Sequence, residues 1–183
     1  MLPVFLDTCV LLKPYLCDSM LTIAESGLYR PLWSPTVLDE LRRNLIRRGL
    51  DDKQIGHRFD QMNEAFPDAQ VTGYEALIAQ MTNHPKDRHV LAAAVHGGAE
   101  ILVTENLRDF PEDSVSQFAL EVVSQDTFLL DQLDLAPAEV LAALRRQVSR
   151  YHREPRTVEA LLAILGAPAS GCPGLARACG RML

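Results

Sequence analysis

The sequence lacks the features that mark membrane proteins, secreted proteins and proteins with structural zinc sites. No apolar run is long enough to span a bilayer. Asp7 interrupts the apolar start of the chain, and no basic segment of the kind that opens a signal peptide precedes it. The four cysteines include no Cys-x-x-Cys pair, which argues against a zinc site or a thioredoxin-like redox motif. These absences predict a cytoplasmic protein with reduced thiols.

The sequence also has little positive charge. Its 18 Lys and Arg residues stand against 24 Asp and Glu, giving a net charge of -6, so it has no overall basic footprint for nucleic acid. A local basic patch remains compatible with an anionic substrate, and acids collected in a metal site would also lower the net charge. The chain has 183 residues, of which 48% are hydrophobic and 23% are charged. This length and composition predict one globular domain with a sizeable core.

Short apolar runs alternate with helical patterns along the chain. The clearest buried strands are predicted at residues 4–6 and 101–103, and further strand candidates lie at 29–33, 69–71 and 119–123. Helices are predicted over residues 18–26, 35–48, 51–65, 74–81, 87–96, 126–133, 137–151 and 157–165. This alternation predicts an α/β fold with a mostly parallel sheet. Residues 166–183, rich in Gly, Pro, Ala and Cys, are predicted to be irregular.

Acidic or amide side chains stand at the edges of several predicted elements. Asp7 ends the first strand, Glu40 lies one turn into a helix and Asp87 opens another, while Asn106 and Asp109 follow the strand at 101–103. Strand ends in an open parallel sheet gather at one edge. Carboxylates gathered there repel one another unless a cation lies between them. Hard oxygen ligands suit Mg²⁺ or Mn²⁺, and that chemistry indicates phosphodiester hydrolysis.

Each of these positions also has a purely structural interpretation. Asp7 can be a helix N-cap, and Asp87 before an apolar helix has the pattern of a capped helix start. Glu40 can complement the helix dipole, and Asn106 and Asp109 can be turn residues. Taken alone, Asp7 leaves the two interpretations even, while Glu40 and Asp87 favour the structural one.

Basic and hydroxyl side chains near these acids are candidates for contacts with nucleic acid. Arg43 and Arg47 share one side of the helix that carries Glu40, where they would contact phosphates or form a solvated face. Thr104 could orient a water or phosphate through its hydroxyl. A second arginine set follows the same logic with weaker positional support: Arg145, Arg146, Arg150, Arg153 and Arg156.

Two rival chemistries find no support. Haloacid-dehalogenase phosphatases carry a second Asp two residues after the first, where this chain has Cys9. His84 and His89 flank Asp87, but their spacing matches no common zinc-ligand pair. The two histidines are therefore predicted to be surface or outer residues of the site.

Taken together, the segments at residues 6–8, 37–42, 85–94 and 103–110 resemble, in order, the motifs of the PIN domain family. The resemblance runs from about residue 3 to residue 123. Members of that family are metal-dependent nucleases, and many are VapC-type toxins of bacterial toxin–antitoxin pairs. The resemblance implies a three-layer α/β/α fold with a central, mostly parallel sheet of four to five strands. It also implies a Mg²⁺ or Mn²⁺ site at one edge, with Asp7, Glu40 and Asp87 as metal-binding acids.

The sequence departs from the family pattern at two positions. Cys9 stands where an Asn commonly follows the first Asp-Thr, and Asn106 stands where the last motif commonly has an acid. A branch of the family that this chain resembles also has Asn there, with an acid like Asp109 downstream. The predicted catalytic set is Asp7, Glu40, Asp87, Asn106 and Asp109, with Asn106 as the fourth metal ligand.

The resulting prediction is a metal-dependent endoribonuclease of residues 1–125, with a helical extension and irregular tail at 126–183 packed on the same domain. Its expected partners are RNA, a cognate antitoxin whose Arg reaches into the acidic pocket, and a second copy of the chain, with no membrane contact. The neutral Asn106 motivates an alternative, a nucleic-acid-binding or regulatory module with little or no catalysis.

Overall fold

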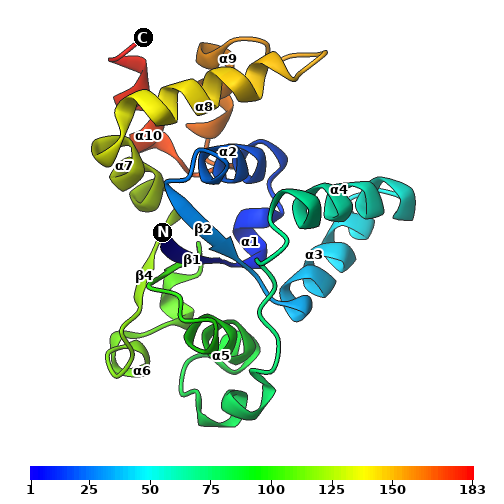
Figure 1. Ribbon diagram of the computed structural model, residues 1–183, viewed down its shortest axis with the longest axis vertical. Coiled ribbons are helices and arrows are strands. Elements are labelled where there is room, and N and C mark those ends of the chain that lie inside the picture. The colour runs from blue at the N-terminus through cyan, green and yellow to red at the C-terminus, as the bar shows by residue number, and fades with distance from the viewer. The chain divides into compact units, whose positions relative to one another are not determined.

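The computed structural model describes all 183 residues, which form two compact units (Figure 1). The sheet unit comprises residues 2–12 and 30–123. The helical unit comprises residue 1 and residues 13–29 and 124–183. The domain boundary predicted after residue 125 stays a prediction. The helical unit also includes residues 13–29, which lie inside the range predicted for the first domain.

The sheet unit is built on a four-stranded parallel sheet in the order β2-β1-β3-β4. β1 pairs in parallel with β3, which sets Leu6 beside Val103, and β3 pairs in parallel with β4. The strands are β1 (Leu2–Leu6), β2 (Tyr29–Leu32), β3 (Ile101–Val103) and β4 (Glu121–Val123). The side chains of Val4, Phe5 and Leu6 are fully buried, as the apolar run predicted. The predicted α/β class with a parallel sheet is confirmed.

The strand predicted at residues 69–71 does not form. Only a single parallel bridge joins Gln70 to Trp33, flanked by backbone hydrogen bonds from Trp33 N to Ala69 O and from Val71 N to Trp33 O. Gly73 then turns the chain with φ +81°, a conformation that side chains other than glycine's rarely allow, so the pairing stops there.

Helices flank the sheet in the same unit and begin where the sequence provides caps. Ser34 Oγ accepts a hydrogen bond from Val37 N at 3.2 Å, with Pro35 at the first helical position, and this starts α3. Asp51 and Gln54 form a capping box that starts α4. The helices are α1 (Thr8–Leu11), α3 (Pro35–Arg47), α4 (Asp52–Ala65), α5 (Arg88–His96) and α6 (Glu112–Val115). Three short 3₁₀ helices accompany them, η1 (Glu75–Gln80), η2 (Pro85–Asp87) and η3 (Leu107–Asp109), so the helix predicted at 74–81 is 3₁₀ instead of α.

The helical unit contains α2 (Pro14–Ala24), α7 (Gln125–Leu135), α8 (Pro137–Ser149), α9 (Val158–Leu165) and α10 (Pro173–Gly180). The prediction that residues 166–183 are irregular is wrong over α10. Pro173 opens this helix, and both carboxylate oxygens of Asp126 accept hydrogen bonds from its first turn, from Gly174 N and Leu175 N at 2.9 Å each. The cap comes from 48 residues earlier in the chain, which a local pattern does not reveal. Every helix is too short or too polar to cross a lipid bilayer.

Candidate metal centre

A cavity of about 510 Å³ in the sheet unit lies where β1 ends and α1 begins. It brings together Asp7, Glu40, Asp87 and Asn106, four of the five residues predicted as catalytic. The other lining residues are Thr8, Cys9, Leu12, Arg43, Asn44, Arg47 and Lys86. Asp109 and Thr104 do not line the cavity, but each contacts an acid that does.

Asp7 is almost completely buried, with 3% of its surface exposed. Its Oδ1 accepts a hydrogen bond from Thr8 N at 2.7 Å, so it does cap α1, while its Oδ2 accepts one from the Thr104 hydroxyl at 2.7 Å. Burial raises the pKa of Asp7, and the hydrogen bonds from Thr104, Cys9 and Thr8 offset this only in part. Asp7 therefore caps α1, as the structural interpretation predicted, and its role as a metal ligand stays a prediction.

Thr104 was predicted to contact nucleic acid, but its side chain is fully buried and its hydroxyl donates to Asp7. The same hydroxyl accepts a hydrogen bond from Asn106 N at 3.1 Å. Thr104 therefore links the loop after β3 to the carboxylate at the end of β1, and no part of it is exposed to a phosphate.

Glu40 is held on both carboxylate oxygens. Thr8 Oγ1 donates to Oε2 at 2.8 Å, and His89 Nε2 lies 3.0 Å from Oε1. Burial works to raise the pKa of Glu40, but the hydrogen bonds from His89 and Thr8 outweigh it and lower the pKa. Glu40 is therefore fixed and ionised at neutral pH, with α1 and α5 setting its position.

Asp87 stands at the start of α5, yet its side chain forms no cap hydrogen bond. It is 8% exposed, and its Oδ2 is a buried oxygen without a hydrogen-bond partner. Burial, the adjoining carboxyl of Asp109 and the charge of Asp7 raise the pKa of Asp87 to about 7. The capping interpretation therefore finds no support in the contacts. A buried carboxylate oxygen that accepts no hydrogen bond, in a cavity lined by other oxygen donors, matches the ligand set of a hard divalent cation.

Cys9 and Asn106 mark the two departures from the common motif. The Cys9 thiol donates to Asp7 Oδ2 at 3.4 Å and accepts from Glu105 N at 3.3 Å. Burial and the charge of Asp7 raise the pKa of this thiol to about 12, so it stays neutral. Asn106 lines the cavity, where its neutral amide stands in place of the acid of the common motif. Cys9 thus helps to orient Asp7.

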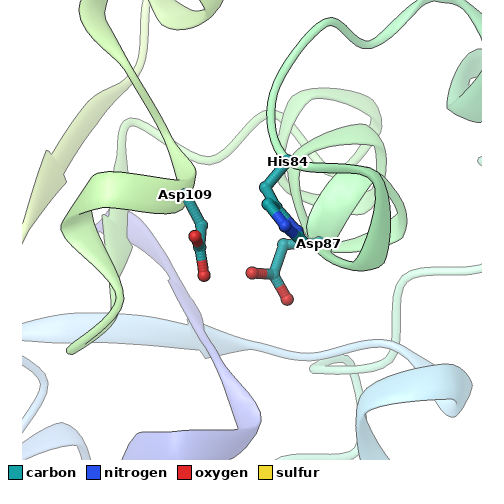
Figure 2. Close-up of side chains that lie close together, drawn as sticks. All are labelled: His84, Asp87 and Asp109. Atoms are coloured by element: carbon teal, nitrogen blue, oxygen red, sulfur yellow. The ribbon is translucent and has the colours of Figure 1, made fainter.

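His84, Asp87 and Asp109 form a further cluster beside the cavity (Figure 2). One ligand atom from each lies within 4.8 Å of the other two. Lys86 adds a positive charge here, with Nζ 3.3 Å from Asp109 Oδ2 and 3.9 Å from Asp87 Oδ2. Sequence reasoning missed His84 in this role, because its partner Asp109 comes from a distant loop and the local spacing matched no zinc motif.

The acidic cavity lies at the strand ends of a parallel sheet in an α/β protein. Residues 3–108 match the sequence profile of the PIN domain. The chain therefore belongs to the PIN domain family. Residues 125–181 match a second profile, the VapC50 C-terminal domain. Over 117 residues the chain is 41% identical to the "Putative ribonuclease VapC50" of Mycobacterium tuberculosis (strain ATCC 25618 / H37Rv). That alignment covers 62% of this chain and 69% of the relative. No solved structure matches the chain.

Proposed function

We propose that the chain is a metal-dependent endoribonuclease that acts as a VapC-type toxin. The observation that carries the proposal is the convergence of Asp7, Glu40 and Asp87 on one cavity, where one buried carboxylate oxygen of Asp87 accepts no hydrogen bond. Membership of the PIN domain family and the similarity to a putative ribonuclease support RNA as the substrate.

The residues present fit a Mg²⁺ or Mn²⁺ ion held by Asp7, Glu40, Asp87 and Asn106. Such an ion would supply a polarised phosphoryl oxygen and a water of lowered pKa for in-line attack on phosphorus. The chain contributes the fixed geometry. Thr104 and Thr8 N orient the carboxylate of Asp7, while Glu40 is oriented from both sides. No side-chain nucleophile is needed for this reaction.

His89 is a positioning residue in this proposal. His89→Ala is expected to weaken Mn²⁺ binding by about tenfold, because outer partners of metal ligands typically contribute about 10- to 100-fold in affinity. His89→Gln keeps an N–H donor for Glu40 Oε1 and should retain most of the affinity. Calorimetric titration with Mn²⁺ measures both variants. Equal losses in the two variants would indicate a packing role and contradict the positioning role.

Arg43 and Arg47 extend from α3 to the same cavity and are exposed, which suits contacts with the phosphates that flank a scissile bond. The double variant Arg43→Gln/Arg47→Gln should bind single-stranded RNA more weakly. Its slope of log affinity against log salt should also be smaller by about 1.4, from about 0.7 per lost phosphate contact.

Arg42 and Arg48 provide the matched control, since they lie on or directly after the same helix but do not line the cavity. Arg42 is engaged by Asp52 at 2.6 Å. The variant Arg42→Gln/Arg48→Gln removes the same total charge. Equal salt slopes for the two double variants would reject a specific phosphate contact at the cavity.

The proposal is tested by incubating the protein with a mixed single-stranded RNA pool in Mn²⁺, Mg²⁺ or EDTA. Cleavage that EDTA abolishes is the expected result. RNA binding without cleavage in either metal would instead favour the alternative, a binding module, and Asn106→Asp would then test whether the neutral fourth ligand limits activity.

The toxin part of the proposal has its own test. A cavity that gathers Asp7, Glu40 and Asp87 suits the guanidinium of an antitoxin arginine, which forms bidentate bonds with carboxylates. Expression of the chain alone should arrest growth, and co-expression of a small protein encoded beside it should restore growth. Normal growth on expression would contradict a toxin. The predicted homodimer and cytoplasmic location stay predictions.

A further inference from the structure

The helical unit has a cavity of its own, with a volume of about 490 Å³. In this unit α8 packs against α2 (Figure 1). Residues 14, 15 and 18 at the start of α2 and residues 150–154 at and after the end of α8 line the cavity. All of these residues belong to the helical unit, so the cavity is separate from the candidate metal centre in the sheet unit.

Two tyrosine rings form adjoining walls of this cavity. The ring centroids of Tyr15 and Tyr151 lie 5.8 Å apart with an interplanar angle of 74°, which is an edge-to-face arrangement. Both side chains are only half-buried, so part of each tyrosine remains accessible. A flat aromatic guest in such a corner can stack on one ring and meet the other with its edge, and both arrangements are favourable between aromatic groups. The corner therefore suits a planar, aromatic ligand.

Hydrogen bonds hold the two walls in place. The side-chain amide of Gln147, which is fully buried, donates to the Tyr151 hydroxyl at 2.8 Å and to the main-chain oxygen of Tyr15 at 3.1 Å. The Ser19 hydroxyl donates to the oxygen of the same amide at 2.8 Å, and the Tyr151 hydroxyl donates to Asp18 Oδ2. Because the Tyr151 ring is fixed in advance, it loses little conformational freedom when a ligand stacks on it.

Asp18 provides a hydrogen-bond acceptor in the cavity. Its Oδ2 accepts from Tyr151, and its Oδ1 accepts from the Thr22 hydroxyl at 3.3 Å, a long distance for such a bond. A carboxylate has about four lone-pair positions, so acceptor capacity remains for a ligand. The other acid of the cavity, Glu154, accepts from Arg156 N at 3.0 Å.

This acceptor favours one of the RNA bases. Guanine has two adjacent N–H donors on its Watson–Crick edge, which match the two oxygens of a carboxylate. Uracil has a single N–H between two carbonyl oxygens, and these would be repelled by the second carboxylate oxygen. Unpaired bases that stack on aromatic side chains are commonly read through this edge.

Positive charge gathers beside the cavity in a chain that is acidic overall. Residues 145–156 contain five arginines and one acidic residue, whereas the whole chain has a net charge of -6. Arg150 is ion-paired with Glu25 at 2.8 Å. The side chains of His152 and Arg153 are exposed and form no hydrogen bond or ion pair. A free cation at an aromatic cavity is complementary to the phosphate that adjoins a bound base.

We propose that this cavity binds an unpaired base of single-stranded RNA and prefers guanine to uracil. The tyrosine rings stack the base, Asp18 accepts from its Watson–Crick edge, and Arg153 contacts the adjoining phosphate. The inference rests on the proposed function in one respect, because RNA is the substrate proposed there. It adds a contact with RNA that lies outside the cleavage centre.

RNA binding by the full chain in EDTA tests the stacking contact, measured by fluorescence anisotropy. The probes are a labelled short oligouridylate and the same oligomer with one central guanosine. Tyr151→Leu should weaken binding of the guanosine probe by about tenfold, the effect expected when one stacking ring is lost. Tyr151→Phe keeps the ring and should retain most of the affinity. Equal losses in the two variants would indicate that the Tyr151 hydroxyl only supports packing, and would overturn the stacking contact.

Arg153→Gln tests the phosphate contact at an exposed position, where the substitution does not endanger folding. The slope of log affinity against log salt should be smaller by about 0.7, the value for one lost phosphate contact with a single strand. Arg156→Gln is the matched control, because Arg156 is exposed in the same segment but does not line the cavity. Equal salt slopes for the two variants would overturn this contact.

Asp18→Asn tests the preference for guanine. The wild type should bind the guanosine probe more tightly than the oligouridylate, and Asp18→Asn should bring the two affinities closer together. Equal affinities of the wild type for the two probes would overturn the preference. A preference that is unchanged in Asp18→Asn would overturn the role of this carboxylate.

The outcomes separate this inference from the proposed function. RNA cleavage by a chain whose cavity variants all bind RNA as the wild type does would overturn the base site and leave the ribonuclease proposal standing. Binding that Tyr151→Leu and Arg153→Gln weaken, in a protein that cleaves no RNA with either metal, would support the base site and reject the ribonuclease. If these variants instead lose only the binding of a small protein encoded beside the chain, the cavity serves a protein partner and the inference is overturned.

Discussion

Asp7→Asn is expected to abolish metal-dependent RNA cleavage while raising the thermal stability of the metal-free protein. Asp7 is 3% exposed and lies in one cavity with Glu40 and Asp87, so its charge is both desolvated and repelled. Asparagine removes the charge at almost unchanged volume. Cleavage should fall at least about a hundredfold, because loss of an outer partner alone costs about 10- to 100-fold.

The hydrogen bonds around position 7 can survive the substitution in part. The amide oxygen can still accept from Thr8 N, and the amide nitrogen can donate to the Thr104 hydroxyl, which accepts as readily as it donates. The Cys9 thiol and the Thr104 hydroxyl, which both donate to Asp7 Oδ2, lose that acceptor, so they offset part of the gain from removing the buried charge. A gain of about 1 kcal/mol corresponds to about 3 °C in Tm for a chain of this length.

The stability gain should depend on pH with a definite sign. The pKa of Asp87 is raised to about 7, so between about pH 4 and pH 7 the folded chain holds a proton that the unfolded chain has released. The free energy of unfolding of the metal-free wild type therefore falls as pH rises through this range. The charge of Asp7 contributes to that shift, so Asp7→Asn should gain more at about pH 8 than at about pH 5.

Calorimetric melting of both proteins in EDTA, at both pH values, checks this prediction alongside the cleavage assay. Excess Mn²⁺ should then stabilise the wild type more than Asp7→Asn, since binding to the folded state raises Tm. A lower Tm for Asp7→Asn in EDTA would show that the carboxylate contributes more as the cap of α1 than it costs as a buried charge.

The sequence was sufficient for the positions of the acids because each lies where a local pattern changes. Asp7 follows an apolar strand, and Asp87 precedes an apolar helix, so the parallel-sheet rule alone brings them to one edge. The sequence pattern did not reveal the contacts that hold these acids in place. Thr104 contacts Asp7 from 97 residues away, and His89 contacts Glu40 across 49 residues. Such pairs depend on side-chain direction in the folded chain, which periodicity does not specify.

The same limit explains the error over α10. A run of Gly, Pro, Ala and Cys has weak helical preference by itself, and the helix forms because Asp126 of α7 caps it from a distant part of the chain. Propensity describes what a segment prefers when it is alone. The cap, like the partners of Glu40, is a tertiary contact that overrides that preference.

The affinity for Mn²⁺ is expected to rise by about tenfold for each pH unit up to about pH 7 and to level off above it. A metal ligand must be deprotonated, and burial and the contacts of Asp87 raise its pKa to about 7 in the metal-free chain. Below that pH the ion must displace a proton, which lowers the affinity tenfold per unit for each proton released. The pKa of Asp7 is also raised, so the dependence steepens further in acid.

Two neighbours of Asp87 should move this midpoint in opposite directions. The carboxyl of Asp109 raises the pKa of Asp87, so Asp109→Asn should shift the midpoint to lower pH. The Lys86 ammonium lowers that pKa, so Lys86→Met should shift the midpoint to higher pH. Titration calorimetry in buffers of different ionisation enthalpy counts the protons released at each pH. An Mn²⁺ affinity that stays constant from about pH 5.5 to about pH 7.5 would mean that Asp87 is already ionised before the metal binds. Equal shifts of the pH midpoint in the two variants would mean the same.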